Sequence, residues 1–313
     1  MRYKVYVIVV FMMFSAFLPA GQAGAKAQSS PSQQWEILHE NDFLTFTDRY
    51  YSAGSFIGYT KRFESGLFQK SSNRKEQLRF GIGQETYTPT KIKSRDTADF
   101  DRPYAGYLSG YARWTSASIS DLFLVQVDVG ITGGASGAQG FQQWYHRAIV
   151  TSAEAPEWVA QIPNAFHTNL MIQYIKEWRL SENPFSVTAV LSPTGVLGTR
   201  DMYVQPEVAI HFGRRNALQN SIAFDQIGTT TKEIFFGLRA GYRQVFYDAL
   251  LEGSRNGDAP FTVTPESGFL YGAFDFKHRF ERNDYKVSFI HTTKRTALAD
   301  GHSYLSLSYA RQF

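Results

Sequence analysis

Apolar and polar residues alternate along most of the chain. Between Phe123 and Thr132 every odd-numbered position is apolar, whereas Gln126 and Asp128 stand among the even-numbered ones. Residues 305–313 alternate in a similar way. Because successive side chains of a strand point to opposite faces, this period of two predicts strands with one apolar face.

Segments of this kind occur about twelve times, and each is about as long as a strand that crosses a bilayer at a tilt. They cover residues 34–46, 52–64, 76–88, 105–116, 121–132, 167–180, 185–196, 202–214, 232–247, 267–281, 285–294 and 302–313. Beyond the N-terminal residues, no stretch is apolar enough to predict a transmembrane helix.

A sheet with one apolar face fits two closed architectures. In a soluble barrel or sandwich the apolar side chains point inwards, whereas in a membrane barrel they face lipid and polar side chains line the lumen. The many Gly and Ser residues on the polar face favour a narrow, filled lumen. The final strand ends in Phe313, which resembles the targeting signal of bacterial outer-membrane barrels. The sequence therefore predicts an all-β fold, a transmembrane antiparallel β-barrel of about 12 strands.

Aromatic residues near the ends of the predicted strands also favour the membrane barrel. Such residues often form girdles at the two membrane–water interfaces. The residues that suggest girdles here are Tyr50, Tyr51, Tyr104, Tyr107, Trp114 and Tyr203.

The N-terminus has the features of a secretory signal peptide. Arg2 and Lys4 precede an apolar run at residues 6–18, and a small-residue stretch ends at Ala27. The alternative is an uncleaved anchor, but the run is short for a membrane span. We expect a signal peptide at residues 1–25 and a single outer-membrane β-barrel domain at residues 26–313.

The longest interruption of the alternating pattern covers residues 133–166. Its middle, from Gln139 to Val150, is compatible with one helix, and a second short helix is expected from Pro156 to Ile162. The sequence therefore predicts short helices in an extracellular loop.

The composition excludes several classes of protein. Of 313 residues, 43% are hydrophobic and 19% charged, which is not the composition of a disordered chain. The absence of Cys excludes a disulfide scaffold, a Cys-ligated metal site and a Cys nucleophile. A formal net charge of +4 is too small to suggest nucleic acid as a partner.

Three polar clusters are unusual for a passive pore. They are Glu40-Asn41-Asp42 with residues 47–54, Gln84 to Pro89 leading to Asp101-Arg102, and residues 133–139 followed by Gln142, Gln143 and His146. Each cluster also has a structural interpretation. Asp–Arg pairs often hold loops together, Gly-rich runs often only turn the chain, and a single His is often structural.

Together these clusters resemble those of the lipid A 3′-O-deacylases of the Gram-negative outer membrane. The resemblance covers nearly all of the mature chain and is densest from Glu40 to Gln161. It implies a twelve-stranded barrel, in agreement with the strand count. It also implies a carboxylic ester hydrolase that removes the 3′-linked acyloxyacyl group of lipid A and requires calcium as its cofactor.

The resemblance assigns roles to five residues. His146 would be the general base, a task that suits an imidazole because it exchanges protons near neutral pH. Asn41 and Asp42 match the family's essential pair and offer oxygen atoms to calcium, a hard cation. Glu85 is a further candidate ligand, and Ser52 would position the substrate or support the oxyanion. A Ser52 nucleophile with His146 as its base is the alternative to direct attack by water.

Three basic residues are candidates for binding the phosphates of the substrate. The family has an adjacent basic pair in the loop after the second cluster, whereas here Lys93 and Arg95 are separated by a serine. Arg102 is the third candidate. Ordinary solvated or loop-anchoring groups are the alternative interpretation.

The expected partners are lipid A or lipopolysaccharide as substrate and the surrounding outer-membrane lipids, without nucleic acid. We expect a monomer that crosses the outer membrane many times, with its active site toward the outer leaflet. Two other functions compete with this one. An outer-membrane phospholipase A would also use calcium and a barrel, but its His-Asp-Ser segment is absent here. A non-enzymatic pore needs none of the three clusters.

Overall fold

The computed structural model describes residues 30–42, 45, 47–63, 66–68, 73–150, 155–255 and 257–313. The expected signal peptide lies outside these residues. Among them, no helix is both long enough and apolar enough to span a membrane.

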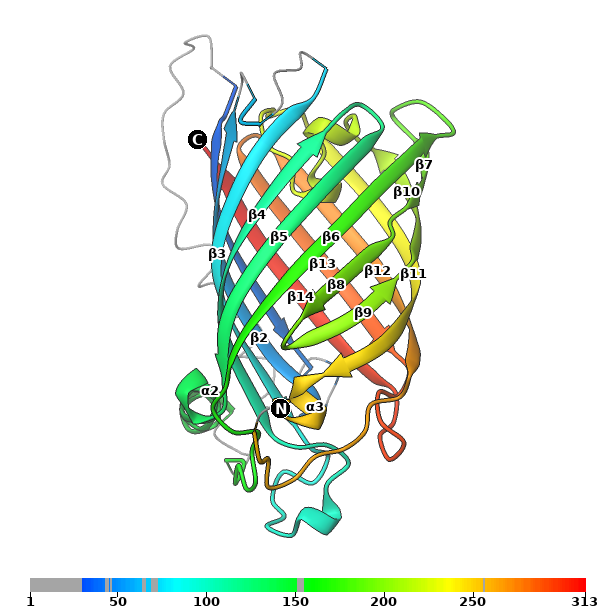
Figure 1. Cartoon of the computed structure of the whole chain (residues 1–313). Helices are drawn as coiled ribbons and strands as arrows, with labels where there is room; N and C mark the ends of the chain where they lie inside the picture. The colour runs from blue at the N-terminus through cyan, green and yellow to red at the C-terminus, as the bar shows by residue number, and fades with distance from the viewer. Residues whose placement is uncertain are drawn as a thin grey trace.

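A single closed antiparallel sheet dominates the fold (Figure 1). Its segments are β1 (Gln33–Asn41), β2 (Tyr50–Phe63), β3 (Lys75–Thr88), β4 (Ala105–Ala117), β5 (Asp121–Thr132), β6 (Phe166–Arg179), β7 (Ser186–Leu191), β8 (Thr194–Gly198), β9 (Asp201–Gln205), β10 (Glu207–Arg214), β11 (Glu233–Asp248), β12 (Gly268–Phe280), β13 (Asn283–Thr292) and β14 (His302–Gln312). The sheet closes where β1 pairs with β14, with Glu36 opposite Ala310.

Two of the barrel strands are interrupted at proline. Residues 192–193 separate β7 from β8, both of which pair with β6, and Pro206 separates β9 from β10, both of which pair with β11. A proline has no N–H to donate to the ladder, so it ends regular pairing. The fourteen segments therefore form twelve barrel strands, as predicted.

The first strand is shorter than the alternation predicted. It ends at Asn41 instead of continuing to residue 46. The reason is that the carbonyl of Asp42 accepts hydrogen bonds from the backbone N–H groups of Thr45 and Thr47, which turns the chain away from the sheet.

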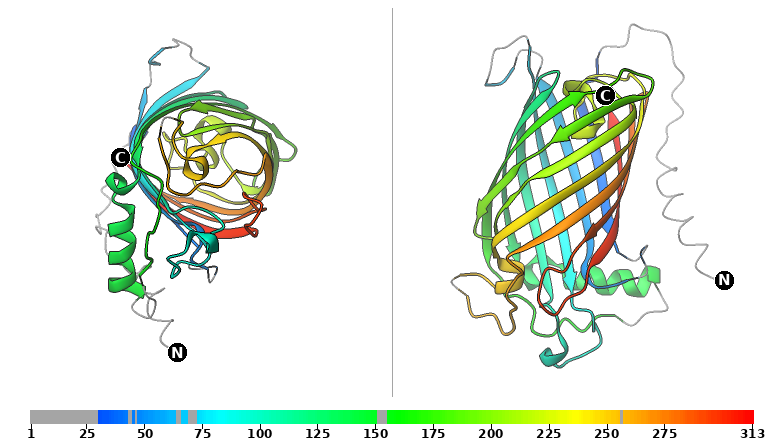
Figure 2. Two further views of the ribbon diagram at one scale, coloured as in Figure 1. Left: turned by 60° about the horizontal axis from the view of Figure 1, so that its bottom comes forward. Right: turned by 90° about the vertical axis from the view of Figure 1, so that its right-hand side faces the viewer.

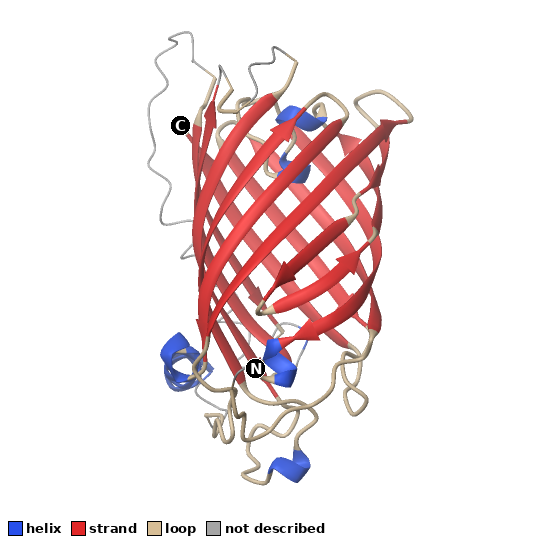
Figure 3. Cartoon of the chain, viewed as in Figure 1, coloured by secondary structure: helices blue, strands red, loops and turns tan. Residues whose placement is uncertain are grey.

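The short helices lie at the two ends of the barrel (Figure 3). They are η2 (Thr97–Asp99), η3 (Gly134–Ser136), α2 (Ala138–Tyr145), its π-helical continuation η4 (His146–Val150), η5 (Leu218–Asn220), η6 (Ile222–Phe224) and α3 (Ala249–Glu252). The helix predicted at residues 139–150 is confirmed. The one predicted at residues 156–162 is wrong, because Trp158 and Ala160 adopt left-handed backbone angles, with φ of 53° and 52°.

The side chains have the inverted arrangement of a membrane barrel. Large apolar residues on the outer face are exposed, for example Ile82 at 59% and Leu238 at 50%, whereas Glu36 and Arg79 are buried inside. The tyrosines that suggested interface girdles do not lie on this outer face. Tyr107 is fully buried, and the hydroxyl of Tyr51 donates to Glu40 in the lumen at 2.5 Å. Trp114 is the one predicted girdle residue on the outer face, where its ring contacts Phe123. Other outward aromatics are Trp35, Phe80, Trp178, Phe212, Phe236, Phe274 and Phe289.

We call the two ends of the barrel the loop end and the turn end. The loop end carries residues 42–49, 89–104, 133–165, 249–267 and 293–301, and it is at the bottom of Figure 1. Among the connections at the turn end that the structure describes in full, residues 215–232 form the longest. Figure 1 shows this longer connection at the upper end of the barrel (yellow-green). We call residues 215–232 the luminal segment.

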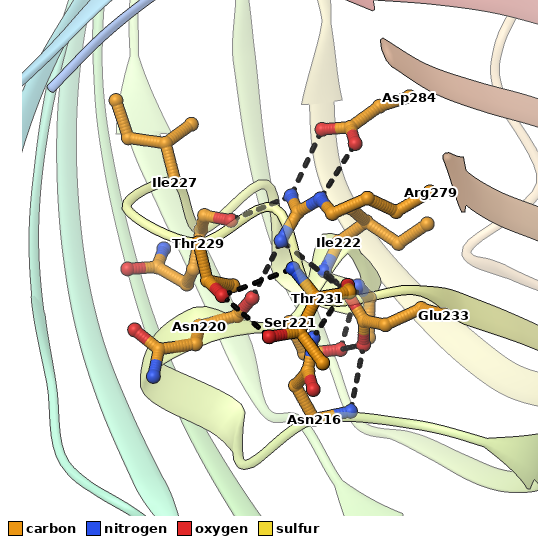
Figure 4. A network of polar contacts seen from close by, with 12 residues as sticks. Asn216, Asn220, Ser221, Ile222, Ile227, Thr229, Thr231, Glu233, Arg279 and Asp284 are labelled. Atoms are coloured by element: carbon orange, nitrogen blue, oxygen red, sulfur yellow. Dashed lines mark hydrogen bonds and ion pairs between the residues drawn. The ribbon is translucent and has the colours of Figure 1, made fainter. Parts of the chain in front are cut away.

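Buried charges hold the luminal segment and its surroundings in place (Figure 4). Arg279 is fully buried, contacts Asp284 at 2.6 Å and Glu233 at 3.4 Å, and donates to the carbonyls of Asn220 and Gln226. Apolar lumen residues complete the packing around Leu218; they are Ala117, Leu122, Leu124, Ile175 and Val190. The lumen is thus filled at this end.

Removing the Arg279 charge should weaken the whole barrel. Arg279→Met leaves Asp284 and Glu233 buried without their cation, and loss of one member of a buried pair costs about 3–5 kcal/mol. We expect the temperature at which the heat-modifiable folded band disappears on gels to fall. Lys232→Met removes the same charge from an exposed position nearby and should leave that temperature unchanged. An Arg279→Met barrel as heat-resistant as the parent would contradict this account of the lumen.

Candidate functional site

A β-bulge in β2 lies at the loop end of the barrel wall. The register between β2 and β3 shifts between Tyr51 and Ala53, so Ser52 is the additional residue. A bulge of this kind changes the face of the sheet to which a side chain points. Tyr51 points into the lumen, where it contacts Glu40, whereas the hydroxyl of Ser52 donates to Asp48 at 2.7 Å.

Asp48 brings together three elements of the candidate site. Its Oδ2 lies 3.1 Å from Nε2 of His146 on η4, and its Oδ1 accepts hydrogen bonds from Ser52 and from Nε2 of Gln142 on α2 at 3.4 Å. The amide of Gln142 also donates to Ser52 at 3.3 Å. One carboxylate therefore links the loop after β1, the start of β2 and the helix.

Glycine residues allow the helix to lie close to the barrel. Gly137 has a φ of +70° and turns the chain from η3 into α2. On β4, a Cβ added to Gly106 would lie 2.3 Å from Oγ of Ser136 and 2.5 Å from Cβ of Ala138. Since real Cβ contacts are longer than this, a larger residue at position 106 would push the helix away from the wall.

The loop after η4 fixes the orientation of Gln142. Its Oε1 accepts a hydrogen bond from the indole N–H of Trp158 at 2.8 Å. The Trp158 ring stacks on Tyr104, with 5.2 Å between the ring centroids. Gln142 and His146 face the barrel, whereas Gln139 contacts Gln161.

The imidazole of His146 is buried, with 5% of the residue exposed. One nitrogen, Nε2, faces Asp48, whereas the buried Nδ1 has no hydrogen-bond partner among the described residues. A buried polar nitrogen without a partner is costly, so its retention suggests a ligand or reactant at that position. The geometry leaves Nδ1 available as a proton acceptor.

Asp42 is the second carboxylate of the site and is 1% exposed. Its Oδ2 accepts hydrogen bonds from the N–H of Arg49 at 2.8 Å and from the hydroxyl of Thr47 at 2.9 Å. Burial raises the pKa of the Asp42 carboxyl to about 8, and the neighbouring Asp48 carboxylate adds to this shift.

The arrangement fits a hard cation with oxygen ligands. Burial, together with the neighbouring Asp48 carboxylate, raises the pKa of Asp42, and a bound cation would offset that penalty. No group of three His, Cys, Asp or Glu side chains suited to a metal occurs in the described part of the chain. Calcium also accepts backbone carbonyl and hydroxyl oxygens, so Asp42 and Asp48 are the candidate charged ligands for such a cation. Asn41, the last residue of β1, lies opposite Ala53 and next to these groups in sequence.

The structure does not bring Glu85 to this group. Strand alternation places Glu85 on the luminal face, where it forms a two-pronged ion pair with Arg200 at 3.0 and 2.7 Å. Arg102 is also internal. Its guanidinium donates to the carbonyls of Pro103 and Leu250 and lies 4.5 Å from the centre of the Tyr87 ring.

Glu85 and Arg102 line a cavity of about 480 Å³ within the loop end of the lumen. Burial and the nearby Arg295 lower the pKa of Arg102 to about 10. Because Arg102 lies inside the lumen, it is separated from Lys93 and Arg95, which are exposed on the loop between β3 and β4. Arg95 pairs with Glu157 at 3.0 Å, which connects that loop to the one after η4.

The sequence interpretation selected His146, Asp42 and Ser52, and the structure places all three around Asp48. Asp48 was not selected, although it lies in the polar stretch that follows the first cluster. The only sign of its role in the sequence is that Asp48 is an acidic residue between two selected residues, Asp42 and Ser52. Nothing in the strand periodicity indicates that a loop folds back so that this residue meets a distant helix.

The fold and these side chains define a membrane-type β-barrel with a polar site at the outer rim of its wall. The model of the family described as "Outer membrane protein LpxR" matches residues 7–313, so the chain belongs to this family. This confirms the resemblance drawn from the sequence motifs. Membership supports modification of lipid A in the outer membrane. No curated protein sequence matches the chain.

Solved structures with a similar fold include LpxR from Salmonella typhimurium. It is 19% identical, with a TM-score of 0.73 over 90% of this chain and 100% of that one. The β-domain of the Bordetella autotransporter BrkA has 9% identity and a TM-score of 0.46, over 91% and 100% of the two chains. The KdgM porin in complex with disordered oligogalacturonate has 6% identity and a TM-score of 0.43, over 90% and 99%.

Calcium binding should depend on pH through Asp42. In the cation-free protein this carboxyl keeps its proton up to about pH 8, whereas calcium requires the carboxylate. We expect the affinity to strengthen as the pH rises toward 8, by up to about tenfold per pH unit, and then to level off. Isothermal titration calorimetry over a pH series measures this. Asp42→Asn should bind weakly at every pH. Equal affinities of the parent protein well below and above pH 8 would remove Asp42 from the ligand set.

Proposed function

We propose that this protein is an outer-membrane carboxylic ester hydrolase that removes the 3′-linked acyloxyacyl group of lipid A. The observation that carries the proposal is the buried His146, whose Nε2 is held by Asp48 while Nδ1 has no partner among the described residues. A hydrolase needs such a base beside a group that stabilises developing negative charge. The neighbouring Asp42 and Asp48 carboxylates provide a place for a cation with that role.

His146 acts as the general base in the proposed mechanism. Its Nε2–H donates to Asp48, which fixes the tautomer in which Nδ1 carries the lone pair. Nδ1 takes a proton from a water molecule as that water attacks the ester carbonyl. Asp48 then stabilises the imidazolium cation, and the proton passes from Nδ1 to the departing alkoxide of the sugar. Asp48 is therefore a positioning residue that acts through His146.

Asp42 and Asp48 are the charged residues that would hold calcium, with backbone and hydroxyl oxygens completing the set. When bound, calcium would supply the positive charge that stabilises the oxyanion. Asn41 stands beside Asp42 and is assigned a supporting role. Glu85 is less suitable as a ligand, because its carboxylate is already neutralised by Arg200 inside the lumen.

Direct attack by water is favoured over a serine nucleophile. The hydroxyl of Ser52 donates its hydrogen to Asp48 and accepts one from Gln142. A nucleophilic serine would donate to the imidazole instead. Ser52 is thus suited to positioning the substrate or to supporting the oxyanion.

The loop end is proposed to face the cell exterior, where lipopolysaccharide forms the outer leaflet. Barrels of this type carry short periplasmic turns and longer extracellular loops, and this chain has the longer loops around the candidate site. Lys93 and Arg95 are exposed at the same end and are candidates for phosphate contacts. A monomer suffices, since one chain closes the barrel. The filled turn end of the lumen argues against a passive pore.

Loss of the base should abolish most of the activity without affecting the fold. His146→Gln keeps a polar side chain of similar size but removes the basic nitrogen, and loss of a general base costs about 10²–10⁴-fold in rate. Mass spectrometry of lipid A from cells that express the variant should show the 3′-linked group retained. His291→Gln, at an exposed position of the wall, should behave like the parent. Full activity of a correctly inserted His146→Gln barrel would exclude His146 as the base.

Asp48→Asn tests the positioning role when it is assayed at saturating calcium, because Asp48 is also a proposed calcium ligand. An amide cannot stabilise the imidazolium, so we expect the rate to fall by about 10²–10⁴-fold. Because the imidazolium loses its carboxylate partner, the acid limb of the pH–rate profile should also move to lower pH, whereas a purely structural change would lower only the amplitude of the profile. Asp258→Asn removes an exposed carboxylate at the same end and serves as the control. An unchanged profile in Asp48→Asn would sink the assignment.

A further inference from the structure

The helix formed by α2 and η4 has two chemically different faces. Its inner face carries Gln142 and His146, both buried against the barrel. Its outer face carries Phe141, Trp144 and Arg147, all exposed. These residues are three positions apart, so they form one stripe along the helix.

The outer stripe is strongly apolar for an exposed surface. Phe141 is 38% exposed and Trp144 is 52% exposed, and their rings lie 5.7 Å apart. The helix cannot turn this stripe inward, since Gln142 and His146 are fixed by Asp48 and Trp158. The two aromatic rings must therefore be covered by something other than the described residues or remain in water.

The position of the helix indicates what covers them. Figure 2 shows α2 outside the barrel wall at the loop end, lying across the barrel axis instead of along it. It packs on β3 and β4. On β3, the neighbouring outward residues Phe80 and Ile82 are 52% and 59% exposed and belong to the lipid-facing wall. The helix that carries the aromatic stripe thus packs at the loop end of strands whose outward side chains face lipid.

We propose that the outer face of α2 and η4 is a membrane-docking surface. Phe141 and Trp144 insert into the upper part of the outer leaflet, and Arg147 contacts the phosphates of its anionic lipids. An amphipathic helix parallel to the membrane, with aromatic residues on one face and a basic residue beside them, is the usual interfacial arrangement. A second protein chain is a poorer occupant, because the helix packs on β3 and β4, whose outward side chains already face lipid.

This surface would also determine how the substrate arrives, a consequence that rests on the proposed function. With its outer face in the leaflet, the helix holds His146 and Asp48 just above the lipid. An acyl ester near the headgroup of a membrane lipid then reaches the site with little displacement from the bilayer. The lipid contact itself does not depend on which ester is cleaved.

Spin labelling tests the lipid contact without any measurement of activity. The chain has no cysteine, so Trp144→Cys provides a unique attachment site for a nitroxide. In vesicles of phosphatidylcholine and phosphatidylglycerol, the label at 144 should relax more with oxygen than with a water-soluble nickel complex. A label at Ala98→Cys, exposed on η2, should show the opposite order. A label at 144 that resembles the one at 98 would overturn the proposal.

A second experiment separates docking from catalysis. For Phe141→Ser combined with Trp144→Ser, we expect the lipid concentration for half-maximal hydrolysis in vesicles to rise about tenfold. The maximal rate in detergent mixed micelles should be unchanged. Arg147→Gln should raise the lipid concentration for half-maximal hydrolysis in vesicles about fivefold. Phe185→Ser, which removes an exposed ring from the turn end, is the control. An equal loss of activity in vesicles and in micelles would mean that the Phe141 and Trp144 rings stabilise the site and do not bind the membrane.

Discussion

The need to pair every backbone N–H and C=O group inside the hydrocarbon layer governs this structure. An open sheet edge in lipid would leave a row of polar groups unpaired, so the sheet must close, as it does between β1 and β14. Closure and strand alternation together send every second side chain into the lumen. The outer face becomes apolar, and charged residues such as Arg79 and Arg279 are left inside a narrow tube. They are tolerated there because carboxylates and the luminal segment neutralise them and accept their hydrogen bonds.

This constraint leaves little room for chemistry deep within the barrel. The turn end is filled by the luminal segment, and in the cavity at the loop end Glu85 is paired with Arg200 and Arg295 with Asp248. The candidate base lies instead at the outer rim, where the strand ladder ends and where Nδ1 of His146 has no hydrogen-bond partner among the described residues. The bulge at Ser52 is the device that makes this possible, since it directs one residue of β2 to the outside while Tyr51 still faces the lumen.

The fold was accessible from the sequence because it follows from one repeating pattern. The period of two indicates which face of each strand is apolar. The lengths of the segments indicate that each strand crosses the membrane, so all twelve strands were predicted. The errors came from features that periodicity does not encode. The first strand was extended past Asp42, and a helix was expected where Trp158 has a left-handed backbone. The tyrosines taken as girdle residues face inwards, so the membrane barrel was correct although that particular argument for it was not.

The candidate site was predictable only in part, and strand parity would have improved the prediction. Glu85 lies opposite Gly54, which in turn lies opposite Glu40, so alternation alone places its carboxylate in the lumen. Asp48 is different, because its position depends on how a loop folds. That loop is oriented by contacts with α2, and α2 is oriented by Trp158 and its stack on Tyr104. Barrel strands accept many apolar residues on their outer face, which is compatible with a shared fold at 19% identity. The rim site has no such freedom, since one carboxylate must meet an imidazole, a hydroxyl and an amide from three separate elements.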